Sequence, residues 1–105
     1  MSKHRRDAIV RIRLRSTASG GRRSPLRRPY FGCPTFFGDE ETGWDCRFLT
    51  GEIDEEVVPG GPAVELPAAW LSRDQVRPRL HARATFRLWE ARVIGEGEVL
   101  IVLAE

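Results

Sequence analysis

The chain has 105 residues, of which 41% are hydrophobic and 30% charged, so it can form one globular domain with a modest core. Its longest apolar run, residues 99–104, is far shorter than the roughly 20 residues of a membrane-spanning helix, and arginines interrupt any N-terminal signal region, which predicts a cytoplasmic protein. The net charge of +2 conceals two opposite blocks, because residues 1–28 carry ten Lys or Arg and one Asp (+9), whereas residues 39–65 carry nine acids and one Arg (−8).

Alternation of apolar and polar residues with a period of two, typical of half-buried β-strands, recurs along the chain. The runs that predict strands are residues 8–15, 44–48, 80–88 and 99–103. In the first run, Val10, Ile12 and Leu14 alternate with arginines. The last run is apolar on both faces and rich in β-branched residues, so we expect it to be a buried strand.

Turn signals separate these runs, and no segment sustains a helical pattern beyond a single turn over residues 72–75. The turn signals are Ser19-Gly20-Gly21, Gly38-Asp39, Pro59-Gly60-Gly61-Pro62 and Gly95-Glu96-Gly97. The chain is therefore predicted to be all-β. We expect a small closed antiparallel β-barrel of about six strands over residues 8–105, preceded by a basic N-terminal tail over residues 1–7. Side chains fill a barrel of this size, so function is expected on its outer surface and loops.

No residue pattern typical of a catalytic or cofactor site is present. The chain lacks a phosphate-binding loop and a G-x-S-x-G motif, and neither of its two histidines has a Ser or Cys partner nearby in the sequence. Cys33 and Cys46 lack the C-x-x-C spacing of a metal or redox site, so we expect buried, reduced thiols, with a disulfide as the alternative. The sequence predicts a protein that is not an enzyme and that uses no cofactor, metal or nucleotide.

Arginines are concentrated in the first predicted strand and in the loop after it. The strand would place Arg11, Arg13 and Arg15 on its exposed face. The loop carries Arg22, Arg23, Arg27 and Arg28, followed by Tyr30 and Phe31. Guanidinium groups beside aromatic rings suit phosphate contact and base stacking, which favours nucleic-acid binding. The alternative is that these arginines only keep the sheet face hydrated and pair with the acidic block.

A series of short segments resembles the C-terminal domain (domain three) of elongation factor Tu. In the family's order and nearly at its spacing, the segments are Gly20-Gly21-Arg22, Ser24-Pro25, Pro29-Tyr30, Pro34-Thr35-Phe36-Phe37, Thr50-Gly51-Glu52-Ile53, Val57-Val58-Pro59-Gly60, Phe86-Arg87-Leu88 and Arg92-Val93-Ile94-Gly95-Glu96-Gly97-Glu98-Val99. The resemblance implies a six-stranded antiparallel barrel that is not itself a catalyst. In that family the barrel holds the T-stem of aminoacyl-tRNA, packs on the GTPase domain and receives the nucleotide exchange factor. No GTPase domain is present in these 105 residues, so we expect a stand-alone module.

The resemblance also assigns roles to single residues. Thr50 matches a position that meets tRNA backbone, and Thr35 stands where the family has a glutamine that contacts tRNA. Arg23 replaces a histidine of the family, and Ala91 replaces a glycine just before Arg92, where alanine lacks the freedom of glycine at positive φ. The glycines expected in positive-φ turns are Gly51, Gly60, Gly95 and Gly97.

These observations predict a non-catalytic binding module for RNA, in particular tRNA-like RNA, or for a translation-related protein. The residues expected to contact RNA are Arg22, Arg23, Arg27, Arg28, Tyr30, Thr35, Thr50 and Arg92. The alternative is a protein-interaction, decoy or immunity-type protein that mimics the barrel and binds a translation-related or toxin protein, because an acidic surface can steer a basic partner.

Overall fold

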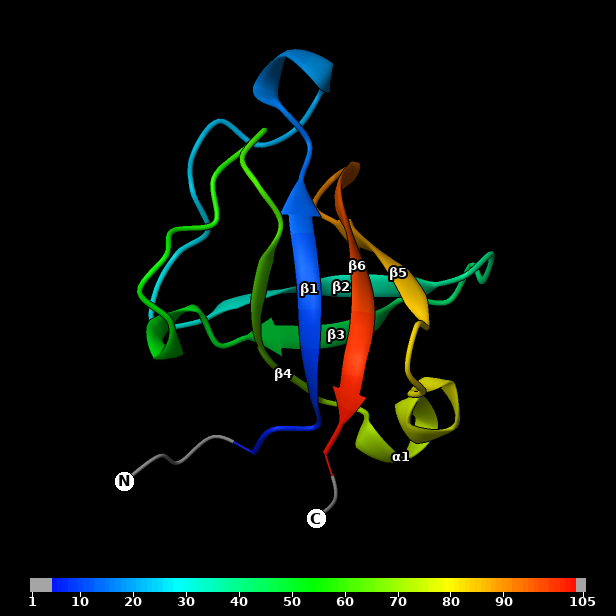
Figure 1. Ribbon diagram of the computed structural model, residues 1–105. Coiled ribbons are helices and arrows are strands. Elements are labelled where there is room, and N and C mark those ends of the chain that lie inside the picture. The colour runs from blue at the N-terminus through cyan, green and yellow to red at the C-terminus, as the bar shows by residue number, and fades with distance from the viewer. Residues whose placement is uncertain (1–4, 104–105) are drawn as a thin grey trace.

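The alternating residues at the start of the chain form one wall of a closed antiparallel barrel (Figure 1). The structure, a computed structural model, describes residues 5–103. The strands are β1 (Ala8–Leu14), β2 (Phe31–Phe37), β3 (Trp44–Phe48), β4 (Val64–Trp70), β5 (Thr85–Trp89) and β6 (Val93–Val102). The helical turns are η1 (Thr17–Ser19), η2 (Thr50–Glu52), α1 (Arg73–Val76) and η3 (Arg77–Arg79). Around the barrel the order is β1-β4-β3-β2-β5-β6, and β6 pairs with β1 to close it, which confirms the predicted fold.

An aromatic cluster fills the barrel. The ring of Phe86 on β5 lies 5.7 Å from Phe37, 6.1 Å from Phe48 and 6.0 Å from Trp70, measured between ring centroids. All four residues are at most 4% exposed. Gly97 on β6 makes room for this cluster, because a Cβ at that position would lie 2.3 Å from the Phe86 ring. The core is therefore an aromatic cluster, and the ring of Phe86 occupies the space that a side chain at position 97 of β6 would need.

Several buried polar groups form a hydrogen-bond network in this core, whereas the buried Nε1 of Trp44 and Nε of Arg87 have no partner among the described residues. The indole Nε1 of Trp70 donates to Thr35 Oγ1 at 2.9 Å, and that hydroxyl donates to the carbonyl of Trp44 at 2.9 Å. The carboxylate of Asp7, which is 3% exposed, accepts the backbone N–H of Trp70 at 2.8 Å and pairs with Arg73 at 3.2 Å. Each buried donor of this network has an acceptor, as burial requires.

Asp7 belongs to the barrel, although the sequence placed it in the basic tail. Its backbone N–H donates to Ala68 on β4 at 2.9 Å, and its carbonyl accepts from Leu103 at 3.0 Å. Residues 1–4 of the predicted tail lie outside the described residues.

The predicted strand over residues 80–88 is wrong in its first half. β5 begins only at Thr85, because residues 77–79 form η3 and Arg83 turns the chain with a φ of 76°. Pro78 has no backbone N–H to give to a strand pairing. Leu80 still packs against the core, so its apolar character reflects burial and not strand alternation.

The glycines of β6 do not form the predicted turn. Gly95 and Gly97 lie inside the strand, and the β5–β6 turn falls at residues 90–92, where Glu90 N–H donates to the carbonyl of Arg92 at 2.8 Å. Ala91 sits at the tip of that turn with a φ of 66°, so the left-handed conformation is kept without glycine. Within β6 glycine is required because there is no room for a side chain: a Cβ on Gly95 would lie 2.6 Å from the carbonyl oxygen of Arg13 on β1.

The other two expected turn glycines differ from each other. Gly60 has a φ of 75°, as expected, whereas Gly51 lies in η2 without a positive φ, and its Cβ would meet the carbonyl of Pro29 at 2.9 Å. The turns after η1 and β2 use Gly20 and Gly38, with φ values of 93° and 51°.

The C-terminal end of β6 is exposed. Ile101 is 54% exposed and Val102 43% exposed, whereas Val99 is fully buried. The expectation of a buried strand is therefore wrong for the last two residues of β6, whose side chains point to opposite faces and are both exposed. Within residues 5–103, no helix has the length and apolar character needed to cross a membrane.

Candidate nucleic-acid interface

Five arginines from three segments of the chain gather at one end of the barrel, which we call the arginine end. They are Arg13, Arg15, Arg22, Arg23 and Arg92. They come from the end of β1, from the loop around η1 and from the β5–β6 turn. These segments lie at the top of Figure 1, opposite the two termini and α1. Closure of the barrel brings them together, because β1 pairs with β6 and the carbonyl of Ile94 accepts from the N–H of Arg15 at 2.9 Å.

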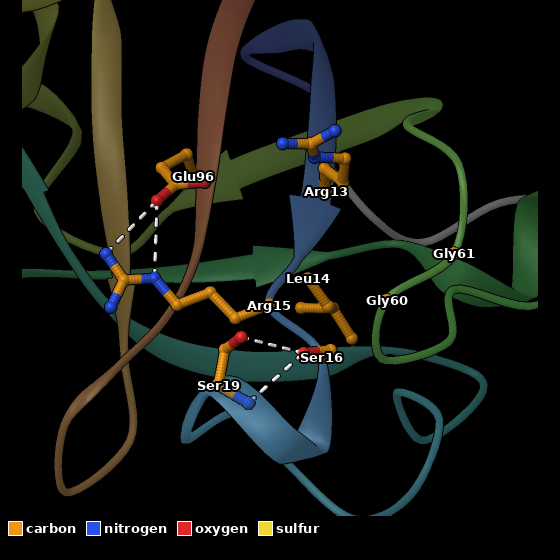
Figure 2. Close-up of a pocket in the computed structure, with 8 residues that line it drawn as sticks. All are labelled: Arg13, Leu14, Arg15, Ser16, Ser19, Gly60, Gly61 and Glu96. Carbon is orange, nitrogen blue, oxygen red and sulfur yellow. Dashed lines mark hydrogen bonds and ion pairs between the residues drawn. The ribbon is translucent and has the colours of Figure 1, made fainter.

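The first of two pockets at the arginine end has a volume of about 400 Å³ and lies between the end of β1, η1 and the Gly60-Gly61 turn (Figure 2). Ser16 caps η1, since its hydroxyl accepts the N–H of Ser19 at 3.1 Å. Arg15 reaches Glu96 at 3.3 Å, and both side chains are about half exposed. Such an exposed pair contributes only about 0–1 kcal/mol, so a phosphate can compete for the guanidinium.

The side chain of Arg13 lies on another side of the same pocket in Figure 2 and makes no hydrogen bond or ion pair within the described residues. Its guanidinium therefore has all of its donors available to a ligand.

The second pocket, of about 310 Å³, lies on the other side of η1 and is bordered by Arg22, Arg23 and Arg92. Arg22 is held in place: it pairs with Glu90, donates to the carbonyl of Ser24 at 3.2 Å and lies 4.8 Å above the ring of Phe31. Arg92 is exposed and makes one long hydrogen bond, 3.4 Å, to the carbonyl of Gly20. Arg23 is exposed and has no hydrogen-bond or ion-pair partner in the part of the chain that the structure describes.

Three further predicted contacts lie along the side of the barrel and outside these pockets. Arg27 is exposed, with its guanidinium 5.9 Å from the Phe31 ring. Arg28 donates to the carbonyl of Ile53. Tyr30 lies beneath the guanidinium of Arg47 at 4.9 Å, so its ring face is already stacked against a cation.

Thr35 and Thr50 do not reach the surface. They are 0% and 2% exposed, and Thr50 Oγ1 donates to the carbonyl of Arg27 at 2.6 Å. A ligand on the outside of the barrel cannot contact either hydroxyl, so both residues act in the fold. The resemblance matched these positions by sequence, which carries no information on burial.

Part of the basic block pairs with the acidic block, as the alternative interpretation expected. Arg11 faces Glu65 across the β1–β4 ladder and contacts its carboxylate at 2.9 Å, and Arg6 contacts Glu52 at 2.6 Å. At the arginine end, Arg15 and Arg22 pair with glutamates from outside that block. Arg13, Arg23 and Arg92 have no carboxylate partner among residues 5–103, so a net positive charge remains there.

The two cysteines face each other across the β2–β3 ladder as free thiols, and both are buried, as expected. Cys33 is 6% exposed and Cys46 fully buried. Burial raises the pKa of the Cys33 thiol to about 12 and that of Cys46 well above its usual range. Both thiols are therefore protonated and unreactive at neutral pH.

The fold and site together define a small all-β barrel with a basic end. Among the described residues, no group of three His, Cys, Asp or Glu side chains is placed to hold a metal ion. No protein-family model matches the chain, and no curated protein matches it. What the arginine end offers chemically is a set of guanidinium donors around two shallow polar pockets, an arrangement suited to the phosphates of a polyanion.

Proposed function

We propose that this protein is a non-catalytic RNA-binding module that grips phosphates of a tRNA-like RNA with its arginine end. The observation that carries the proposal is the convergence of Arg13, Arg23 and Arg92, three exposed arginines without carboxylate partners, around η1. Their charges come from separate segments and are held by a closed barrel, so the phosphate-binding groups are positioned before a ligand arrives.

Two further observations support RNA as the polyanion. The arginine end and the loop that follows it meet at Phe31, because Arg22 and Arg27 lie 4.8 and 5.9 Å from the centroid of the same ring. The sequence segments that resemble domain three of elongation factor Tu include the Gly20-Gly21-Arg22 loop at this end. A barrel similar to that domain would bind RNA backbone in the cytoplasm and would leave any chemical step to another protein.

Binding of labelled, unfractionated tRNA, measured by fluorescence anisotropy from 50 to 200 mM salt, tests the proposal. The double variant Arg13→Gln/Arg23→Gln removes two charges at the arginine end. The matched control, Arg77→Gln/Arg83→Gln, removes two exposed arginines that, within the described residues, also have no ion-pair partner. Arg77 begins η3, which lies with α1 at the opposite end of the barrel (Figure 1).

Each phosphate contact contributes a slope of about −0.7 to −0.9 to log K against log salt. Loss of two contacts should therefore make the slope shallower by about 1.4–1.8 and weaken binding roughly 25- to 60-fold at 0.1 M salt. The control should keep the wild-type slope. Absence of tRNA binding at 50 mM salt, or equal losses in both double variants, would refute the proposal.

A further inference from the structure

A second surface, on the outer wall of β2 and β5, has a different chemistry. A groove of about 480 Å³ runs there between Phe36 on β2, Trp89 on β5 and the β2–β3 loop at residues 38–41. Trp89 is 40% exposed, and its ring packs edge-on against Phe36 with a centroid distance of 5.8 Å. We call this surface the aromatic–acidic groove. In Figure 1 its loop is the turn at the right that joins β2 to β3.

The rim of the groove carries carboxylates that the barrel does not use. Glu40 is already occupied, because both of its carboxylate oxygens accept from Arg79 Nε, at 2.8 and 3.0 Å. Asp39 and Glu41 are exposed and make no side-chain hydrogen bond or ion pair among residues 5–103. Arg87 also lines the groove: it donates to the Glu40 carbonyl at 2.9 Å and lies 5.4 Å from the Phe36 ring centroid, while its buried Nε has no partner among the described residues. The groove therefore presents two free negative charges beside an aromatic ring.

Trp89 differs from the other aromatic rings outside the core. Each of those other rings, within the described residues, has a guanidinium of the chain over it, with Arg47 on Tyr30, Arg79 on Trp44 and Arg87 on Phe36. The indole ring of Trp89 is the ring type that attracts cations most strongly, yet no guanidinium lies over it within the described residues. An anionic RNA would be repelled by Asp39 and Glu41, whereas a cationic side chain would gain both the ring face and the carboxylates.

We propose that the aromatic–acidic groove docks a basic segment of a partner protein, with an arginine or lysine over Trp89 and neighbouring cationic groups on Asp39 and Glu41. The complementary charges select a cationic peptide over nucleic acid. The groove shares no lining residue with the two pockets of the arginine end, although Trp89 directly precedes the β5–β6 turn that borders one of them. The proposal does not depend on the RNA proposal.

A labelled twelve-residue peptide with four arginines spaced by Gly and Ser is the probe, with the same peptide carrying four glutamates as its control. Anisotropy titrations at 0.15 M salt, where the Debye length is about 8 Å, suppress effects of distant charges. The variant Trp89→Leu removes the ring, and Asp39→Asn/Glu41→Gln neutralises the rim. The matched control Asp54→Asn/Glu55→Gln neutralises two exposed acids that, within the described residues, have no ion-pair partner and lie in the loop before β4.

We expect saturable binding of the arginine peptide and none of the glutamate peptide. Trp89→Leu should weaken binding about two- to fivefold, and the rim variant about two- to tenfold. The affinity of the control variant for the arginine peptide should remain within twofold of the wild-type affinity. Circular dichroism of each variant verifies the fold, and quenching of Trp89 fluorescence by the peptide, missing in Trp89→Leu, locates the contact without relying on affinity.

Three results would overturn the proposal. The first is no saturable peptide binding, or equal losses in the rim variant and its control. The second is self-association that disappears in Trp89→Leu, because a second copy of the chain would then occupy the groove. The third is weaker tRNA binding by Trp89→Leu together with unchanged peptide binding, which would make the ring a platform for nucleotides.

Discussion

Replacement of Thr35 by valine separates a structural role of this residue from a role in RNA contact. The hydroxyl accepts the indole N–H of Trp70 at 2.9 Å and donates to the Trp44 carbonyl at 2.9 Å. Valine has nearly the same shape and suits a strand, but it can neither accept nor donate. Trp70 is fully buried, so its Nε1 cannot turn to water when the acceptor is gone.

The expected loss of stability follows from the indole N–H of Trp70, which would have no acceptor. A buried donor without a partner costs about 1–3 kcal/mol, so the free energy of unfolding should fall by about 2 kcal/mol. For a domain of this size, 1 kcal/mol corresponds to about 4–8 °C, which predicts a Tm lower by about 8–16 °C. Affinity for tRNA, measured well below the Tm, should not change.

Urea and thermal unfolding followed by circular dichroism measure the stability, with Thr42→Val as the control. Thr42 is exposed in the β2–β3 loop, and the same substitution there should change stability by less than about 0.5 kcal/mol. If Thr35→Val kept full stability and lost tRNA affinity, the burial argument would be refuted, and the role implied by the resemblance to domain three of elongation factor Tu would stand.

Two further predictions concern packing and the cysteines. Gly97→Ala places a Cβ 2.3 Å from the Phe86 ring, so it should lower the free energy of unfolding by about 1–3 kcal/mol in urea titrations. The double variant with Phe86→Leu should recover part of this loss. If the losses of the two single variants simply add in the double variant, the clash is contradicted. Because burial raises the pKa of Cys33 from 9.0 to about 12, the unfolded chain loses its thiol proton first, and stability should fall as pH rises from 9 toward 12. At pH 8 an aromatic disulfide reagent should label neither Cys33 nor Cys46 until denaturant is added, and fast labelling of the folded protein would disprove their burial.

The strands were predictable where alternation coincided with pairing. In β1, Val10, Ile12 and Leu14 are all at most 2% exposed while the arginines between them are exposed, as the sequence predicts. The same alternation misled over residues 80–84, because a period of two in a few residues also arises by chance in a loop. There the backbone of Pro78 and Arg83 decided the path of the chain.

Glycine could not be interpreted from sequence because it has two uses. A turn needs its freedom at positive φ, as at Gly60, and a crowded strand needs its missing Cβ, as at Gly97. Only the position of the Phe86 ring, eleven residues away in sequence, distinguishes the two uses at position 97. The β5–β6 turn shows the converse, since Ala91 occupies a left-handed conformation where a glycine was expected to be required.

The candidate site was predictable in part. The density of arginine in residues 11–28 is visible in the sequence, and Arg22 and Arg23 do lie at the arginine end. The sequence did not show that Thr35 and Thr50 are buried, that Arg13 and Arg92 lie at the same end, or that Phe36 and Trp89 form a groove with the β2–β3 loop. No sequence signal for the groove exists, because it is formed by two segments, residues 36–41 and 87–89, that are more than 45 positions apart.

By itself the sequence determined the all-β class, the faces of β1 and β3, and the presence of two opposite charge blocks. These properties depend on neighbouring residues along the chain, whose alternation, turn chemistry and charge are local. Only the tertiary structure decided which charges pair, because closure of the barrel sets Arg11 and Glu65 face to face across 54 positions. It also places Glu96 opposite Arg13, but the carboxylate pairs with Arg15, and Arg13 forms no ion pair among the described residues. Pairing between distant strands is set by the packing of the whole core, and that packing cannot be read from any short stretch of sequence.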